Sequence, residues 1–313
     1  MKRSLSLLSL AVGTLVYAAS LAAPAALAAT STIKSTPSAP GSGQALEISP
    51  PAITMSGNPG QTLRAQISLR DVSQGNLLVS NQINDFVAAG EDGTPKILMG
   101  KDANDSPFSM RKWVVPLPKM LLEPRQIKTL PVIIHIPKNA SPGGHYGVIR
   151  FSGTAPNVKG SGVALSASLG ALMLITVKGP ITEKLSLQEL SVAKLNKDNS
   201  LGQPAKLFES APLGFIEKIK NEGNVHEQPA GNVIIKDMFG KPVAGVNINL
   251  PPRNILPDST RRFTQPLDKS VIGNKRLFGH YTATMTLKYG KGQTLTAKTA
   301  FWVIPWKLIL AII

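Results

Sequence analysis

The chain has 313 residues, a formal net charge of +16 and no cysteine. Without cysteine it can form neither disulfides nor thiolate metal sites, so each domain must be stabilised by a hydrophobic core alone. A surface this basic attracts anionic polymers or lipid head groups. Nucleic acid is a poor candidate, because aromatic residues make up only 5% of the chain and single-stranded bases need aromatic side chains on which to stack.

The N-terminus has the three parts of a secretory signal peptide. Met1-Lys2-Arg3 supplies positive charge, residues 5–23 form an apolar run, and Ala26-Leu27-Ala28 is a cleavage site of small residues. We therefore predict a signal peptide over residues 1–28 and an exported protein. Cleavage leaves a net charge of +14, because 34 basic residues become 32 against 18 acidic ones. Residues 29–45, rich in Ser, Thr and Pro, predict a disordered tether.

Alternation of apolar and polar residues predicts β-strands from Leu46 onward. The alternation is clearest at residues 63–69 and 130–136. Short runs bounded by Gly, Pro, Asn or Asp predict further strands at 77–86, 113–117, 146–151 and 164–177. No helical period separates them, which favours an antiparallel sandwich over residues 46–178, although the small residues of 164–174 also suit a helix.

A second series of strands follows the boundary at Val177-Lys178-Gly179-Pro180. It predicts a second sandwich over residues 179–304, with strands at 215–221, 232–237, 243–249, 262–267, 281–289 and 294–304. The predicted fold class is all-β, with two tandem immunoglobulin-like antiparallel β-sandwich domains.

Each predicted domain contains a Gly-His-Tyr sequence late in that domain. Gly144 and Tyr146 flank His145, and Gly279 and Tyr281 flank His280. In immunoglobulin-type sandwiches a Tyr near the start of a late strand returns its hydroxyl to the backbone at a sheet corner, which predicts a structural role for these glycines and tyrosines. The alternative, histidine ligands or acid-base groups, lacks the spacing of a metal site.

Two further segments stand out, one with a predicted structural role and one as a candidate binding site. Asn221, Gly223 and Asn224 are residue types that tolerate left-handed backbone, so we predict a structural tight turn. If the Pro-rich loop 251–262 meets a later loop, they form a cationic site for phosphate or carboxylate, with Arg253, Arg261, Arg262, Lys275 and Arg276. The alternative is solvated loop charges, with Arg261 bound to the local backbone.

The composition of the C-terminus resembles that of a segment that enters a membrane. Aromatic residues at 301–306 lead into an apolar run that reaches Ile313, well short of the roughly 20 residues that span a bilayer. We interpret residues 305–313 as the start of a C-terminal transmembrane anchor. The alternative is a buried final strand with an apolar tail.

The chain resembles the WxL-interacting cell-surface proteins. The resemblance lies in Pro59-Gly60-Gln61-Thr62-Leu63, in Glu123-Pro124 before residues 127–136, and in Pro142-Gly143-Gly144-His145-Tyr146-Gly147; it extends to 220–226 and 301–306. It implies two immunoglobulin-like domains, a C-terminal anchor, peptidoglycan contact by the first domain and protein contact by the second. No convincing copy of the family's Asn- and Tyr-rich segment is present, so no ligand-contacting residue is carried over. The order of parts also resembles periplasmic pilus chaperones, which are soluble.

These observations predict a binding protein. The chain has no Gly-x-Ser-x-Gly elbow, no phosphate-binding Gly loop and no carboxylate pair placed by spacing, so we predict no enzyme activity and no cofactor. The predicted function is that of an exported, membrane-anchored bacterial cell-surface scaffold. It would contact peptidoglycan or a surface protein partner through loops or a strand edge. The alternative is a two-domain chaperone-like assembly factor for exported subunits, and a more distant one is a wall hydrolase.

Overall fold

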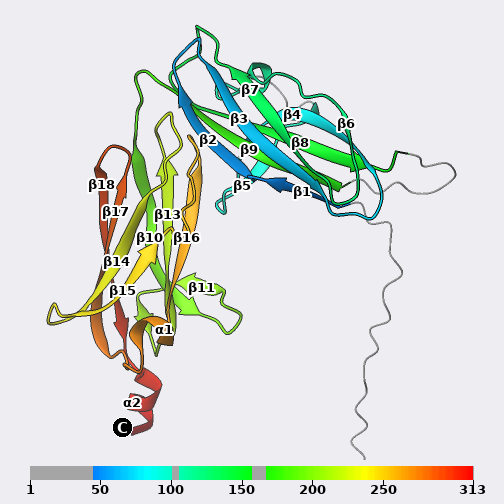
Figure 1. Cartoon of the computed structure of the whole chain (residues 1–313). Helices are drawn as coiled ribbons and strands as arrows, with labels where there is room; N and C mark the ends of the chain where they lie inside the picture. Colours follow the sequence, from blue (N-terminus) through cyan, green and yellow to red (C-terminus); the bar gives the residue numbers. More distant parts are fainter. Residues whose placement is uncertain (1–44, 101–105, 157–166, 313) are drawn as a thin grey trace, which may run out of the picture. The chain divides into compact units, whose positions relative to one another are not determined.

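The computed structural model describes residues 45–100, 106–156 and 167–312 (Figure 1). The predicted signal peptide, nearly all of the predicted tether and residues 164–166 of one predicted strand lie outside these ranges. Regular structure in the described residues is almost entirely β-strand, in sheets that are mostly antiparallel. The prediction of an all-β protein built from sandwiches is therefore confirmed.

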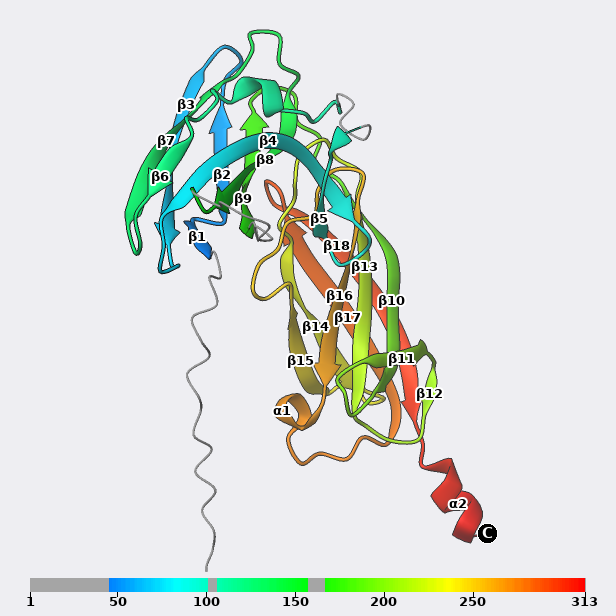
Figure 2. The same cartoon turned by 90° about the vertical axis from the view of Figure 1, so that its right-hand side faces the viewer.

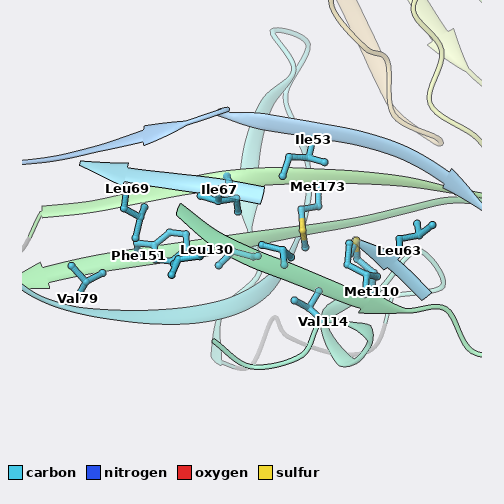
Figure 3. Packing of buried hydrophobic residues seen from close by; sticks show 14 of the residues in the cluster. Ile53, Leu63, Ile67, Leu69, Val79, Met110, Val114, Leu130, Phe151 and Met173 are labelled. Atoms are coloured by element: carbon cyan, nitrogen blue, oxygen red, sulfur yellow. The ribbon is translucent and has the colours of Figure 1, made fainter. Parts of the chain in front are cut away.

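The first sandwich packs a three-stranded sheet against a six-stranded sheet. The smaller sheet has the order β1-β3-β7, with β1 (Leu46–Ser49), β3 (Thr62–Asp71) and β7 (Ile127–His135). The larger sheet has the order β2-β9-β8-β4-β5, with β6 paired to β4; its strands are β2 (Ala52–Gly57), β4 (Leu77–Ala89), β5 (Thr94–Ile97), β6 (Met120–Leu122), β8 (Gly143–Thr154) and β9 (Ala167–Val177). Side chains from both sheets meet in the core, among them the fully buried Ile67, Leu69, Phe151 and Met173 (Figure 3).

The second sandwich packs a four-stranded sheet against a five-stranded sheet. The four strands, in the order β11-β10-β13-β16, are β10 (Leu185–Leu195), β11 (Leu201–Pro204), β13 (Leu213–Asn221) and β16 (Thr260–Leu267). The five strands, in the order β12-β18-β17-β14-β15, are β12 (Leu207–Phe208), β14 (Ala230–Asp237), β15 (Pro242–Ile248), β17 (Gly279–Tyr289) and β18 (Gln293–Val303). Phe215, Tyr281 and Phe301 lie in a core separate from that of the first sandwich.

The chain changes sheets near its beginning. β1 pairs antiparallel with β3 in the smaller sheet, and β2, which follows the prolines at 50 and 51, pairs parallel with β9 in the larger sheet. The parallel pairing runs from Ala52 opposite Leu172 to Gly57 opposite Val177. One segment of chain therefore contributes an edge strand to each sheet.

One predicted strand of the first sandwich is wrong. Instead of a strand at 113–117, the chain forms a 3-10 helix, η2 (Arg111–Trp113), followed by irregular backbone with a single bridge at Val114. The buried Asp85 carboxylate accepts hydrogen bonds from the main-chain N–H of Met110 and of Arg111, both 3.2 Å, and from Ser109 Oγ at 2.6 Å. These bonds favour a tight turn over an extended strand.

Two short helices belong to one end of the second sandwich. α1 (Lys269–Ile272) follows β16, and α2 (Trp306–Ile312) follows β18; both views show them at the same end (Figure 1 and Figure 2). None of the helices in the described part of the chain is long and apolar enough to cross a bilayer.

Candidate functional site: an unpaired strand edge

The first half of β9 has a neighbour on one side only. β8 pairs with β9 along its whole length, from Gly153 opposite Ala167 to Gly143 opposite Val177. On the other side β2 begins to pair only at Leu172. Residues 167–171 therefore form a free sheet edge with respect to the described part of the chain.

The direction of the main-chain groups shows what this edge offers. Leu172 N–H donates to Pro51 O at 2.9 Å, so the main chain of Leu172 faces the β2 side. Because the side to which a strand residue directs its main-chain groups alternates, Gly170 and Ser168 face the same side. The free edge thus presents the N–H and C=O groups of Ser168 and Gly170, whereas Leu169 and Ala171 bond to β8.

The side chains of this half-strand extend the apolar row of the core. Ala171, Met173 and Ile175 share one face of β9 and are fully buried. Leu169 continues the same row but is 36% exposed. An added strand would bury Leu169 and complete the edge at once.

Two other outer strands in the described residues, β7 and β16, carry features that discourage pairing. β7 contains Lys128 and Pro131, and β16 contains Arg262 and Pro266. Charged side chains and prolines on an edge are how natural sheets avoid pairing with other chains. Residues 167–171 read Ala-Ser-Leu-Gly-Ala and contain neither a charge nor a proline.

The two predicted cationic loops lie at opposite ends of β16. Arg253, Arg261 and Arg262 are at its start, and Lys275 and Arg276 follow its end. The strand has 8 residues, which puts roughly 25 Å between the loops. The loops therefore do not meet in one cationic patch.

The basic side chains of these loops differ in their exposure and in their hydrogen bonds. Arg261 is partly buried, and its Nη1 donates to Asn254 O at 2.8 Å, the local backbone contact of the alternative interpretation. Lys275 Nζ donates to Val243 O at 3.1 Å. Arg253 and Arg262 are exposed.

The two tyrosines of the Gly-His-Tyr sequences make different contacts. Tyr281 Oη donates to Phe278 O at 3.1 Å and accepts from Phe278 N–H at 2.9 Å, so it returns to the backbone. Tyr146 Oη lies 3.3 Å from His226 Nδ1, a side-chain contact, and it occupies the space that a Cβ on Gly144 would need. Burial raises the pKa of Tyr146 far above its ordinary value.

The Asn-Gly-Asn segment is fixed by side-chain amides and not by left-handed backbone. Neither asparagine nor Gly223 has a positive φ, which corrects the predicted turn conformation. The buried Asn221 Nδ2 donates to Val225 O and Ile255 O, both 2.8 Å, and its Oδ1 accepts from Gly223 N–H at 2.8 Å. Asn224 Oδ1 accepts from Thr182 N–H at 2.8 Å.

The histidines of the described residues do not gather with acidic side chains. No group of three or more metal-ligating side chains occurs in those parts of the chain that the structure describes. The buried His145 ring packs 4.4 Å from the Trp113 ring, and its Nε2 lies 2.9 Å from Ser141 O. Burial lowers the pKa of His145, and it lowers the pKa of His226 to about 4.

Sequence reasoning did not find the β9 edge. The small residues of 164–174 suggested a possible helix, and a strand pattern does not reveal which strands are outermost. The signal that could have found it is the Ser49-Pro50-Pro51 sequence, because two prolines end the pairing of one strand.

Neither the protein-family models nor the curated proteins match this sequence. Among solved structures, the chain is similar to one from a chaperone–tip adhesin complex of CFA/I fimbriae, with 12% identity over 82% of this chain and 98% of that one, and a TM-score of 0.41. The class 5 fimbriae chaperone CfaA gives 12% identity, 82% and 99% coverage and a TM-score of 0.39. The E. coli chaperone DraB gives 14% identity, 83% and 98% coverage and a TM-score of 0.37. Similarity at this level carries no argument about activity or partner.

Proposed function

We propose that this protein binds an extended segment of another exported polypeptide by adding it as a strand to residues 167–171 of β9. In this role it is a chaperone-like assembly factor. The observation that carries the proposal is the half-strand edge without charge or proline. Export is part of the proposal and depends on the predicted signal peptide, and attachment to the membrane depends on residues 305–313.

Strand addition at this edge supplies affinity with little sequence selectivity. The N–H and C=O groups of Ser168 and Gly170 can form up to four main-chain hydrogen bonds with a partner strand, each worth a net ~0.5–1.5 kcal/mol. Side chains of the partner that lie next to Leu169 would be apolar, because they would join the row that leads into the core. The net charge of +14 after cleavage at residue 28, from 32 basic and 18 acidic residues, favours a partner with acidic flanks.

A proline at Ser168 tests this function. The Ser168 N–H faces the open side, so Ser168→Pro removes an edge donor without removing a bond to β8. Ser168→Ala is the matched control, because it keeps the donor. The probe is a fluorescent 12-residue peptide of alternating valine and threonine with acidic residues at both ends, titrated against the chain that begins at Ala29.

We expect the wild type and Ser168→Ala to bind the probe equally, and Ser168→Pro to bind at least about tenfold more weakly. Hydrogen exchange at Ser168 and Gly170 should slow when the peptide is bound. Equal binding by Ser168→Pro, with an unchanged circular dichroism spectrum and melting temperature, would refute the proposal.

Contact with an anionic cell-wall polymer is the second candidate. It is favoured by the net charge and by the exposed guanidinium groups of Arg253 and Arg262. The resemblance to the WxL-interacting proteins makes the same prediction for peptidoglycan. Retention on purified peptidoglycan should fall as salt rises from about 0.05 to 0.5 M, because charge-driven contact is screened. Ser168→Pro should leave this retention unchanged, which separates the two functions.

A further inference from the structure

One end of the second sandwich exposes aromatic side chains on two separate loops. Phe239, in the turn between β14 and β15, is 88% exposed, and Phe278, just before β17, is 64% exposed. The loops are neighbours, because Met238 Cε occupies the space that a Cβ on Gly279 would need. The same end carries α1 and α2 (Figure 1 and Figure 2).

The turn that carries Phe239 is fixed by hydrogen bonds. Asp237 Oδ1 accepts from the main-chain N–H of Phe239 at 3.0 Å and of Lys241 at 2.9 Å. Gly240 N–H donates to Asp237 O, and Asp237 N–H donates to Lys241 O, both at 3.0 Å. A rigid turn therefore directs Phe239 into the solvent.

The main chain of Phe278 is fixed as well. Its N–H and its C=O both bond to the hydroxyl of Tyr281, whose ring is buried in the core. The preceding residue, Leu277, is also buried, so the chain is anchored on both sides of the exposed ring. Two exposed phenylalanines with fixed backbones indicate a surface built to contact something apolar.

Basic residues occur close in sequence to both rings, with Lys241 after Phe239 and with Lys275 and Arg276 before Phe278. Four exposed basic residues at this end form no ion pair with a described acidic residue: Lys241, Lys269, Lys275 and Arg276. The acidic groups there have other partners. Asp237 and Asp268 accept main-chain N–H groups, and Glu209 pairs with Lys307 at 2.8 Å.

The beginning of α2 adds a third exposed aromatic ring. Trp306 is 45% exposed and follows Pro305, which lines a hollow together with Phe278 and Arg276. Leu310, further along α2, is 64% exposed. We call Phe239, Phe278 and Trp306, with the four cations, the aromatic end.

We propose that the aromatic end docks on the surface of an anionic lipid bilayer, with the phenylalanine rings at the boundary between head groups and acyl chains. Aromatic rings are enriched at that boundary, and lysine and arginine beside them attract anionic head groups. A protein partner fits less well, because the centres of protein interfaces are depleted of lysine, whereas this end carries three exposed lysines, Lys241, Lys269 and Lys275. The inference is independent of the β9 edge, which belongs to the first sandwich.

Vesicle binding tests this surface. The chain that begins at Ala29 is titrated with vesicles of phosphatidylcholine alone or with half phosphatidylglycerol, and binding is measured by co-sedimentation. The variant is Phe239→Ser with Phe278→Ser. The matched control is Leu250→Ser, because Leu250 is 72% exposed but follows the other end of β15.

We expect the wild type and Leu250→Ser to bind the anionic vesicles equally and to bind pure phosphatidylcholine weakly. The double variant should lose about 100-fold, since each ring contributes about tenfold. Equal binding by the double variant would overturn the proposal and assign any vesicle binding to the apolar tail. An equal loss in Leu250→Ser, or no binding by the wild type, would also overturn it.

The melting temperature of the same samples shows whether the variants are folded. Both rings are exposed, so the double variant should keep the melting temperature of the wild type. A second variant, Lys269→Glu with Arg276→Glu, should abolish the preference for phosphatidylglycerol. If that preference survives, head-group attraction by the aromatic end is refuted.

Discussion

Glu217→Gln should remove one large contribution to the pH dependence of the stability of the second sandwich. Glu217 lies in the middle of β13, in the row of Phe215 and Ile219 that faces the core, and it is completely buried. Neither carboxyl oxygen has a hydrogen-bond partner among the described residues. Burial raises the pKa of Glu217 from 4.5 to about 8, so the folded protein keeps this carboxyl protonated near neutral pH.

The size and sign of the effect follow from proton linkage. The folded pKa is raised, so the unfolded chain loses its proton first and stability falls as pH rises. The contribution is fully present below pH 4.5 and is lost as pH approaches about 8. Between these values the free energy of unfolding should fall by about 1.4 kcal/mol per pH unit, a loss of about 3 kcal/mol at pH 7.

Urea unfolding at about pH 5, 6, 7 and 8, followed by pulse proteolysis, measures this slope and separates the two sandwiches by fragment size. Glutamine keeps the shape of the side chain but does not titrate, so the difference between wild type and variant isolates Glu217. The buried Glu227, whose pKa burial raises to about 7, titrates in both proteins and cancels. Identical slopes for wild type and Glu217→Gln would refute the reasoning.

Two further substitutions test the architecture by urea unfolding. Asn221→Ala should cost about 2–4 kcal/mol, because it leaves two buried carbonyls and one N–H without their partner; an effect below about 1 kcal/mol would contradict that role. Gly231→Ala should cost about 2–3 kcal/mol, because its Cβ would overlap the Thr286 carbonyl oxygen on β17, whereas Gly75→Ala, which meets no atom within 4 Å, should be nearly neutral.

Alternating patterns were reliable wherever one face of a strand is buried. In β17 the buried residues Tyr281, Ala283, Met285 and Leu287 alternate with partly exposed neighbours, as the sequence pattern predicts. The same holds for Leu63, with a buried side chain at the start of β3. These strands can be predicted from the sequence because successive side chains face the core and the solvent in turn, which selects apolar and polar residues alternately.

The pattern failed where polar groups decide the structure. The apolar run at 113–117 suggested a strand, but the carboxylate of Asp85, far away in the sequence, fixes a turn just before it. The burial of Glu217 could not be predicted from the sequence either. A carboxyl in an alternating strand is ordinarily on the solvent face, and here it is on the core face. Hydrogen bonds and burial between distant segments are not encoded in local periodicity.

The cationic loops show a second limit of prediction from the sequence. The arginines at and before the start of β16 and the basic pair after its end are close in sequence, yet the strand keeps them apart. Residues that are close in sequence are close in space only when the chain between them turns back. The 8-residue strand β16 is extended, so it separates the two loops.

The open edge of β9 follows from two prolines in another part of the chain. Pro50 and Pro51 have no N–H to donate, so pairing with β3 cannot continue beyond Ser49. The chain then leaves the smaller sheet, and Pro51 O accepts from Leu172 N–H, the point at which β9 gains its second neighbour. Everything before Leu172 on β9 is left without that neighbour because the same segment is occupied in the other sheet. The proposed binding site is therefore a consequence of how one edge strand is divided between two sheets, and a partner strand added at residues 167–171 would supply the neighbour that β9 lacks there.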